Sequence, residues 1–305
     1  MAITLQESLR GLFYAPFYVA LTHGAYEKEG VDVRFIGAPE PGKAAAAIVS
    51  GDADVSWGGP MRVMQTYHRD PSCDLVSFAE VVTRDPFLLV GRTPRPDFSV
   101  RDLAGLTLGS VSEVPTPWMC LQEDLRRAGI APARIARVAD RTMAENAAAL
   151  LAGTIDVAQL FEPFVSTLVE TNGCHVWYAQ ASRGPASYTT FYTRKPMLTA
   201  RREALRQMVR AIYRTQNWVA RADGAAIGEA VQPFFSNVPA AILTAACARY
   251  NALGIWGRDP FLPRAGYDRL LSSLVSGGLV DPGTPYSAAV DNSLALEAIR
   301  DVRLG

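Results

Sequence analysis

The chain has 305 residues, of which 49% are hydrophobic, and its 30 basic and 30 acidic side chains give a formal net charge of zero. This balance argues against a nucleic-acid-binding protein, and no segment approaches the roughly 18 consecutive apolar residues of a membrane-spanning helix. The four cysteines form no C-x-x-C pair and the three histidines lie far apart, so the sequence contains no zinc-binding spacing.

The first third of the chain alternates predicted strands and helices. Strands are predicted at residues 2–8, 31–36, 53–58, 75–82 and 87–92. Helices are predicted within residues 9–30 and at 44–51 and 61–70, because Pro16 suits a first helical turn and Gly51 a helix end. Such alternation with short connections is typical of parallel strands joined by crossover helices.

A second cycle of the same kind follows a proline-containing connector at 93–105. Its strands are predicted at residues 106–113, 135–140, 155–163, 175–180 and 188–195. Its helices are predicted at 114–129, with Thr116 as N-cap, and at 143–153. From about residue 198 the apolar spacing becomes helical, and further helices are predicted to the end of the chain.

The two cycles share one sequence motif. Residues 51–55 and 153–157 both read Gly-x-x-Asp-Val, and each lies between a predicted helix and a strand that leads to an aromatic residue and a proline. In open α/β sheets, ligands lie beyond the carboxyl ends of the strands. Two such units facing one another therefore predict a cleft lined by these strand ends.

We predict an α/β fold with two lobes, each an open and mostly parallel sheet flanked by helices. Residues 1–90 and 193–305 are expected to form the first lobe, and residues 91–192 the second. The strands at 87–92 and 188–195 are expected to cross between the lobes. Two hinge strands of this kind allow closure on a ligand with little change inside each lobe.

Four segments resemble solute-binding proteins of the thiamine-pyrimidine-synthesis-like group, which includes binding proteins for formyl-aminopyrimidine precursors, alkanesulfonates and taurine. They lie at residues 12–35, 44–60, 103–111 and 148–163. The resemblance covers about residues 3–220. It implies a type II periplasmic-binding-protein fold, capture of a small molecule, delivery to an ABC importer and a periplasmic location, and it leaves the ligand open.

The same superfamily contains a fungal enzyme that makes the thiamine pyrimidine from its own histidine and pyridoxal phosphate. The cysteine-rich segment of that enzyme corresponds here to residues 183–195, which contain neither cysteine nor histidine. Residues 57–64 also lack the Lys and His that follow the matching strand of the enzyme. Nucleophile-elbow, phosphate-loop and His-Glu-x-x-His motifs are missing from the sequence. We therefore expect a protein that is not an enzyme and uses no cofactor or metal.

Aromatic residues near the first-cycle strand ends are candidates for the walls of the cleft. Trp57 directly precedes Gly58 and Gly59, which leave room for a ligand and expose backbone N–H groups. The alternative for Trp57 is an indole buried in the core. Tyr14 and Phe17 follow the first strand, and their alternative is packing on a helix face.

In the second cycle the candidates are polar as well as aromatic. Glu113 and Glu162 follow equivalent strands, which favours a ligand with amine or N–H donors, whereas the alternative is a solvated carboxylate or a hinge salt bridge. Thr116 and Trp118 begin a helix whose free N–H groups can hold an anion.

Residues beside the two predicted crossing strands complete the candidate set. Arg84 is expected either to pair with Asp85 or to bind a carboxylate or phosphate. Tyr188 and Thr189 carry hydroxyl groups that can hydrogen-bond a ligand held between the lobes.

These observations predict a solute-binding protein that closes on a small, flat aromatic or heterocyclic molecule, first of all a thiamine-related pyrimidine. The alternatives are a sulfonate or another small acid, a pyrimidine-synthesis enzyme, and a cytoplasmic ligand sensor. A basic cleft with Arg84 pointing in and both glutamates turned away would favour the acid. The first residues lack the basic and then apolar pattern of a signal peptide, so a cytoplasmic location is the alternative to a periplasmic one.

Overall fold

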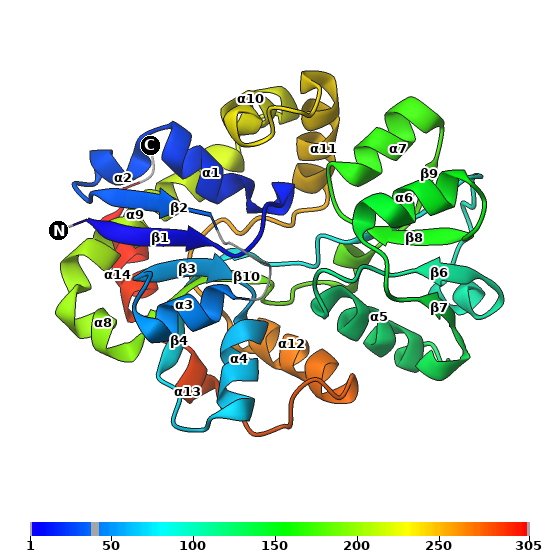
Figure 1. The fold of residues 1–305 in the computed structure, drawn as a ribbon. Helices are drawn as coiled ribbons and strands as arrows, with labels where there is room; N and C mark the ends of the chain where they lie inside the picture. Colours follow the sequence, from blue (N-terminus) through cyan, green and yellow to red (C-terminus); the bar gives the residue numbers. More distant parts are fainter. Residues whose placement is uncertain (1, 38–42, 304–305) are drawn as a thin grey trace.

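The computed structural model describes residues 2–37 and 43–303, whose strands form two five-stranded sheets (Figure 1). The strands of the first sheet, in spatial order, are β2 (Val33–Ile36), β1 (Ile3–Glu7), β3 (Val55–Gly58), β10 (Thr189–Arg194) and β4 (Leu75–Val82). The strands of the second sheet are β7 (Ala136–Val138), β6 (Thr107–Gly109), β8 (Val157–Leu160), β5 (Leu88–Gly91) and β9 (His175–Ala179). The predicted α/β class is confirmed.

The two sheets have the same topology. In the first sheet β1 pairs in parallel with β2 and β3, and in the second sheet β6 pairs in parallel with β7 and β8. The next strand in each sheet is antiparallel and comes from the other cycle: β10 lies between β3 and β4, and β5 lies between β8 and β9. The two Gly-x-x-Asp-Val strands, β3 and β8, therefore occupy equivalent positions.

The chain passes between the sheets in two irregular segments rather than in two strands. β5 pairs only within the second sheet and β10 only within the first, so the prediction that these strands span both lobes is wrong. The reason is that each strand completes its backbone hydrogen bonds inside one sheet. The passages are residues 83–87 and 180–188, called here the connecting segments. We propose that the lobes meet there, and not at residues 90–91 and 192–193.

Helices flank both sheets (Figure 1). They are α1 (Ala15–Thr22), α2 (Ala25–Lys28), α3 (Ala44–Ser50), α4 (Pro60–Arg69), α5 (Thr116–Arg127), α6 (Met143–Leu151), α7 (Phe164–Asn172), α8 (Lys195–Ala200), α9 (Arg202–Val219), α10 (Gly224–Val231), α11 (Ala240–Ala252), α12 (Arg264–Ser276), α13 (Tyr286–Ala289) and α14 (Ser293–Asp301). The helix predicted within 9–30 is divided because Gly24 adopts a left-handed conformation at φ 59°. Within the described ranges, no helix combines the length and apolar character needed to cross a membrane.

The repeated Gly-x-x-Asp-Val motif has the same structural role in both lobes. Gly51 and Gly153 lie at the ends of α3 and α6 with φ 85° and 76°, a region that favours glycine. The Asp54 carboxylate accepts a 2.8 Å hydrogen bond from the Thr4 N–H, and Asp156 accepts one of the same length from Thr107. Each aspartate thus fixes the start of its strand against the neighbouring parallel strand.

The two lobes also contact one another through helices that follow β10 in the chain. α11 packs on α7, and α12 packs on both α5 and α4; Figure 1 shows α11 and α12 on opposite sides of the gap between the sheets. Aromatic contacts continue across the junction, since Phe161 lies 5.2 Å from Phe13 and 5.3 Å from Phe87 between ring centroids. The described conformation is therefore closed, with the lobes in direct contact.

The role of the repeated aspartates can be tested by comparing D54A and D156A with D52A. Each of the first two substitutions removes the acceptor of a part-buried backbone N–H, so we expect the free energy of unfolding to fall by about 1–2 kcal/mol. Among the described residues, the Asp52 carboxylate accepts only from the exposed Ser50 hydroxyl, so D52A should leave stability nearly unchanged. Chemical denaturation followed by circular dichroism measures all three; equal effects would contradict the assigned role.

Candidate functional site

A small cavity of about 30 Å³ lies between the lobes, in front of the connecting segments. The first lobe lines it from the loop after β1 and from the start of α4, and the second lobe from the start of α5. Its lining residues are Leu9, Phe13, Tyr14, Gly59, Met61, Arg62, Phe87, Val114, Thr116 and Tyr188. Four predicted site residues are thus brought together, namely Tyr14, Gly59, Thr116 and Tyr188.

The cavity holds one cationic side chain, Arg62, which the sequence did not lead us to expect. Arg62 lies in the first turn of α4 and is only 8% exposed. Within the described residues its side chain makes no hydrogen bond or ion pair. A buried guanidinium without a partner is costly, and an anion in the cavity would provide that partner.

Two helix starts add to the positive character of the cavity. Gly59 precedes the first residue of α4, and Thr116 is the first residue of α5. The helix dipole makes this end favourable for negative charge, although Pro60 and Pro117 carry no N–H and the Arg62 N–H already bonds the Gly59 carbonyl. A basic residue in the first turn, such as Arg62, opposes that dipole. This unusual placement is the signal in the sequence that could have revealed Arg62.

The two tyrosines of the cavity are neutral hydrogen-bonding groups. Burial raises the pKa of Tyr14 to about 12, and its hydroxyl lies 3.0 Å from Ser8 Oγ. Burial also raises the pKa of Tyr188 well above its usual value, and the Tyr188 hydroxyl has no hydrogen-bond partner in the described part of the chain. Arg62 is therefore the charge that dominates the cavity at neutral pH.

Neither predicted glutamate points into the cavity. Glu113 accepts a 2.9 Å hydrogen bond from the Met143 N–H and so caps α6. Glu162 is fully buried and bonds the guanidinium of Arg249 on α11 and both the N–H and the hydroxyl of Ser166. Burial raises the pKa of Glu162, and Arg249 opposes that rise. Neither carboxylate lines the cavity, so the expectation that both meet a ligand there is wrong. Arg249 and Ser166 hold Glu162, and the Met143 N–H holds one oxygen of Glu113, whose other oxygen is buried without a partner in the described structure.

Three predicted aromatic contacts belong to the cores of the lobes. Trp57 is fully buried and lies between Phe17 and Phe35, with centroid separations of 4.7 and 5.4 Å and nearly parallel rings. Trp118 packs in the second lobe, with the Arg137 guanidinium 4.3 Å from its ring centroid. Trp57, Phe17 and Trp118 therefore do not line the cavity, since each ring is already covered by its own lobe.

Gly58 and Thr189 are buried in the first sheet beside the cavity. Gly58 pairs with Thr190, and a Cβ on Gly58 would lie 3.2 Å from Ser8 Oγ, so a larger residue would be tightly packed there. Thr189 pairs with Val82, and its hydroxyl is buried without a partner. Neither residue lines the cavity.

Arg84 belongs to the first connecting segment and does not line the cavity. It donates a 3.2 Å hydrogen bond to the Ala181 carbonyl and lines a different pocket. The expected partner of Arg84, Asp85, instead pairs with Arg183 at 2.8 Å. Arg183 also bonds Asp124 on α5, so one buried guanidinium joins both connecting segments to the second lobe.

Comparison with a family model decides the family of the chain. The NMT1/THI5-like model matches residues 13–225, more than two thirds of the sequence. The chain belongs to this family. Among curated proteins, a putative binding protein, YtlA, of Bacillus subtilis is 26% identical over 298 residues, covering 96% of this chain and 88% of the relative.

Solved structures with the same architecture include transport proteins and an enzyme. A putative periplasmic sulfonate-binding protein of Methylobacillus flagellatus superposes with a TM-score of 0.78 at 14% identity, covering 99% of this chain and 94% of the other. The desulfurization enzyme DszB superposes with a TM-score of 0.70 at 12% identity, covering 98% and 99%. The type II periplasmic-binding-protein fold is thereby confirmed, and because this fold hosts both binding proteins and an enzyme, it does not by itself determine the chemistry.

The buried Arg183 network can be tested with the R183M variant. Methionine leaves the buried carboxylates of Asp85 and Asp124 without their cation, so we expect the free energy of unfolding to fall by about 3–5 kcal/mol at neutral pH. Because burial raises the pKa of Asp85, the loss should shrink as the pH is lowered and this carboxyl becomes protonated.

The matched control is R300M, which removes an exposed arginine that pairs with its neighbour Asp301. Its stability should stay within about 0.5 kcal/mol of the unmodified protein. Denaturation curves at several pH values measure both variants. A loss in R183M as small as that in R300M would contradict the role of the network.

Proposed function

We propose that this protein is a solute-binding protein that captures a small organic anion between its lobes and delivers it to an ABC importer. The observation that carries the proposal is the nearly buried Arg62, which faces the interlobe cavity without a partner. A planar guanidinium suits carboxylate or sulfonate oxygens because it can donate two parallel hydrogen bonds.

The chemistry of the cavity favours an acid over the thiamine-related pyrimidine that the sequence first suggested. A neutral aminopyrimidine needs acceptors for its N–H groups, but Glu113 and Glu162 already accept hydrogen bonds elsewhere. Arg62, the two helix starts and the Tyr188 hydroxyl all offer positive charge or hydrogen-bond donors. An anion with a small apolar part would match these groups and also the surrounding Leu9, Met61 and Val114 side chains.

Binding, rather than catalysis, agrees with the residues of the cavity. Its described lining contains no carboxylate, imidazole or thiol, so it offers no conventional general base and no cysteine nucleophile. The family and the similarity to a periplasmic sulfonate-binding protein support a transport role and a periplasmic location.

Ligand entry requires the lobes to separate. The cavity of about 30 Å³ is far smaller than the roughly 300–1,000 Å³ of typical small-molecule sites. The connecting segments at 83–87 and 180–188 supply the two points about which the lobes can open. Binding would then stabilise the closed form, in which Arg62 and Thr116 approach the ligand from opposite lobes.

The proposal can be tested by titrating ethanesulfonate, propionate, inorganic phosphate and a neutral aminopyrimidine into the protein. We expect at least one anion to bind and the aminopyrimidine not to bind. R62M should lower the affinity for the anion by about 10- to 100-fold, because it removes a charge-assisted hydrogen-bonding group. Isothermal titration calorimetry measures each affinity, and native mass spectrometry can detect an anion that copurifies.

Arg69 provides a matched control on the same helix. It is exposed at the other end of α4, so R69M changes the net charge equally but leaves the cavity intact. R69M should bind the anion as the unmodified protein does, whereas R62K should show an intermediate loss because its ammonium lacks the planar fork. Unchanged binding in R62M, or binding of the aminopyrimidine alone, would overturn the proposal.

A further inference from the structure

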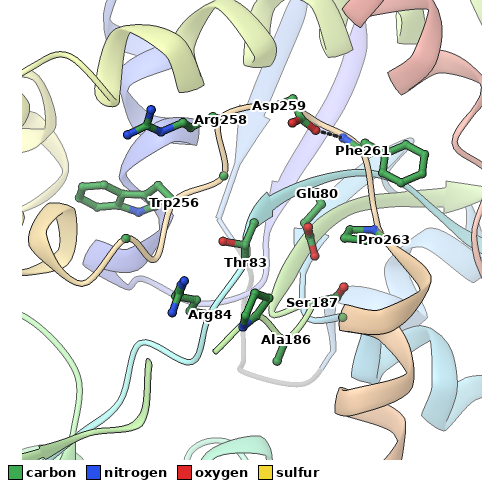
Figure 2. A pocket seen from close by; sticks show the side chains of 14 residues that line it. Glu80, Thr83, Arg84, Ala186, Ser187, Trp256, Arg258, Asp259, Phe261 and Pro263 are labelled. Atoms are coloured by element: carbon green, nitrogen blue, oxygen red, sulfur yellow. Dashed lines mark hydrogen bonds between the residues drawn. The ribbon is translucent and has the colours of Figure 1, made fainter. Parts of the chain in front are cut away.

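A second pocket, of about 340 Å³, lies behind the connecting segments and shares no lining residue with the interlobe cavity. One wall is formed by the end of β4 and by both connecting segments. The opposite wall is the loop at 254–263 and the start of α12 (Figure 2). We call it the rear pocket. A ligand of the rear pocket would be independent of the function proposed for the interlobe cavity.

The floor of the rear pocket carries a carboxyl group that lacks a cation. Glu80 is only 3% exposed, and Figure 2 shows its side chain directed into the pocket between Thr83 and Pro263. Within the described ranges Glu80 forms no ion pair. The pKa of Glu80 is raised to about 8, mainly by burial and to a smaller extent by Asp259, while the neighbouring Ser187 hydroxyl opposes the rise.

Ser187 adds a second unsatisfied polar group at the same place. Its hydroxyl is fully buried, lies beside Glu80 and lacks a hydrogen bond of good geometry in the described structure. Gly266 makes room for it, since a Cβ there would lie 2.8 Å from Ser187 Oγ. A hydroxyl and a carboxyl next to one another are two acceptors for a ligand that carries several N–H donors.

The neighbouring charged groups do not neutralise Glu80. Arg84 is held by the Ala181 carbonyl, and Arg258 is exposed and extends away from Glu80 in Figure 2. The Asp259 carboxylate accepts from the Phe261 N–H, and the Tyr286 hydroxyl donates to the Leu262 carbonyl. The group that would satisfy Glu80 and Ser187 together is therefore an external cation with N–H donors.

We propose that the rear pocket binds a small primary ammonium compound, whose nitrogen bonds the Glu80 carboxylate and Ser187 Oγ. The hydrocarbon part of such a ligand would lie against the apolar surfaces of Phe261 and Pro263 at the entrance. Phe261 is one of the few large hydrophobic side chains that are exposed in the described structure, at 36%. Such a ligand would cover part of that surface.

Binding is expected to depend on pH in a defined direction. A bound ammonium favours the carboxylate form, whereas the free Glu80 carboxyl is mostly protonated below pH 8. An alkylammonium keeps its own charge up to about pH 10. The affinity should therefore rise as the pH is raised from 6 to 8, by about 50-fold for a pKa of about 8, and binding at pH 7 should release a proton.

The test uses n-propylammonium chloride as the probe, titrated into the full chain by calorimetry at pH 6, 7, 8 and 9 with sodium chloride of equal ionic strength as the blank. Two buffers with different ionisation enthalpies count the proton released at pH 7. We expect saturable binding that tightens up to pH 8, a loss of at least about 10-fold in E80Q, and a smaller loss in S187A. Tetramethylammonium, which has no N–H donor, should bind more weakly than the probe.

Glu170 supplies the matched control, because it is exposed on α7 and makes no contact with the rear pocket. E170Q should bind the probe as the unmodified protein does. The stability of E80Q provides an independent check of the role of Glu80. Because the raised pKa of Glu80 makes the free energy of unfolding fall as the pH is raised from 5 to 8, this fall should be smaller in E80Q than in the unmodified protein. Equal binding by E80Q, or no heat beyond that of the sodium chloride blank, would overturn the proposal.

Discussion

Each sheet is completed by a strand from the other of the two α/β cycles of the sequence. β5 completes the second sheet and β10 completes the first, in both cases between strands with which they run antiparallel. Two connecting segments must therefore run between the lobes, and they are held together there by the Asp85–Arg183 pair and by the Gln180 amide, which donates to Asp85. The interlobe cavity lies on one side of these segments, and the rear pocket lies on the other side.

Much of this architecture could be predicted because it is encoded locally. The alternation of strands and helices follows from hydrophobic period and from glycine and proline positions, and the repeated Gly-x-x-Asp-Val motif identified β3 and β8 as equivalent strands. The motif did not itself indicate a ligand site. Its aspartates hydrogen-bond to neighbouring parallel strands, through Thr4 and Thr107, and so belong to the beginning of each strand rather than to its functional end.

The side-chain predictions were wrong where the orientation of a side chain, or a partner far away in the sequence, determined what the side chain contacts. Position at a strand end was correct for Trp57, but its ring lies between Phe17 and Phe35 in the core, while Gly59, which follows the end of β3, lines the cavity. Glu162 bonds Arg249, which is 87 residues away in the sequence and lies on α11, the helix that packs on α7. No local pattern specifies such a contact. Arg62 was missed because its sign in the sequence, a basic residue in the first turn of a helix, was not used, and because its lack of a partner within the described residues depends on the folded chain.

Arg62 and Glu80 are thus the two buried ionisable groups whose lack of a partner carries the functional argument, and they lie on opposite sides of the same connecting segments. Leaving either group unpaired costs stability, so the fold retains both at a disadvantage that a ligand of opposite charge would remove. The walls of the two sites include adjacent residues of one segment, Ser187 for the rear pocket and Tyr188 for the cavity. If the lobes open about these segments, both sites must change shape together. An ammonium compound behind the segments and an anion in front of them would then influence each other's affinity, and the coupling would be the same in both directions because it is a difference of binding free energies.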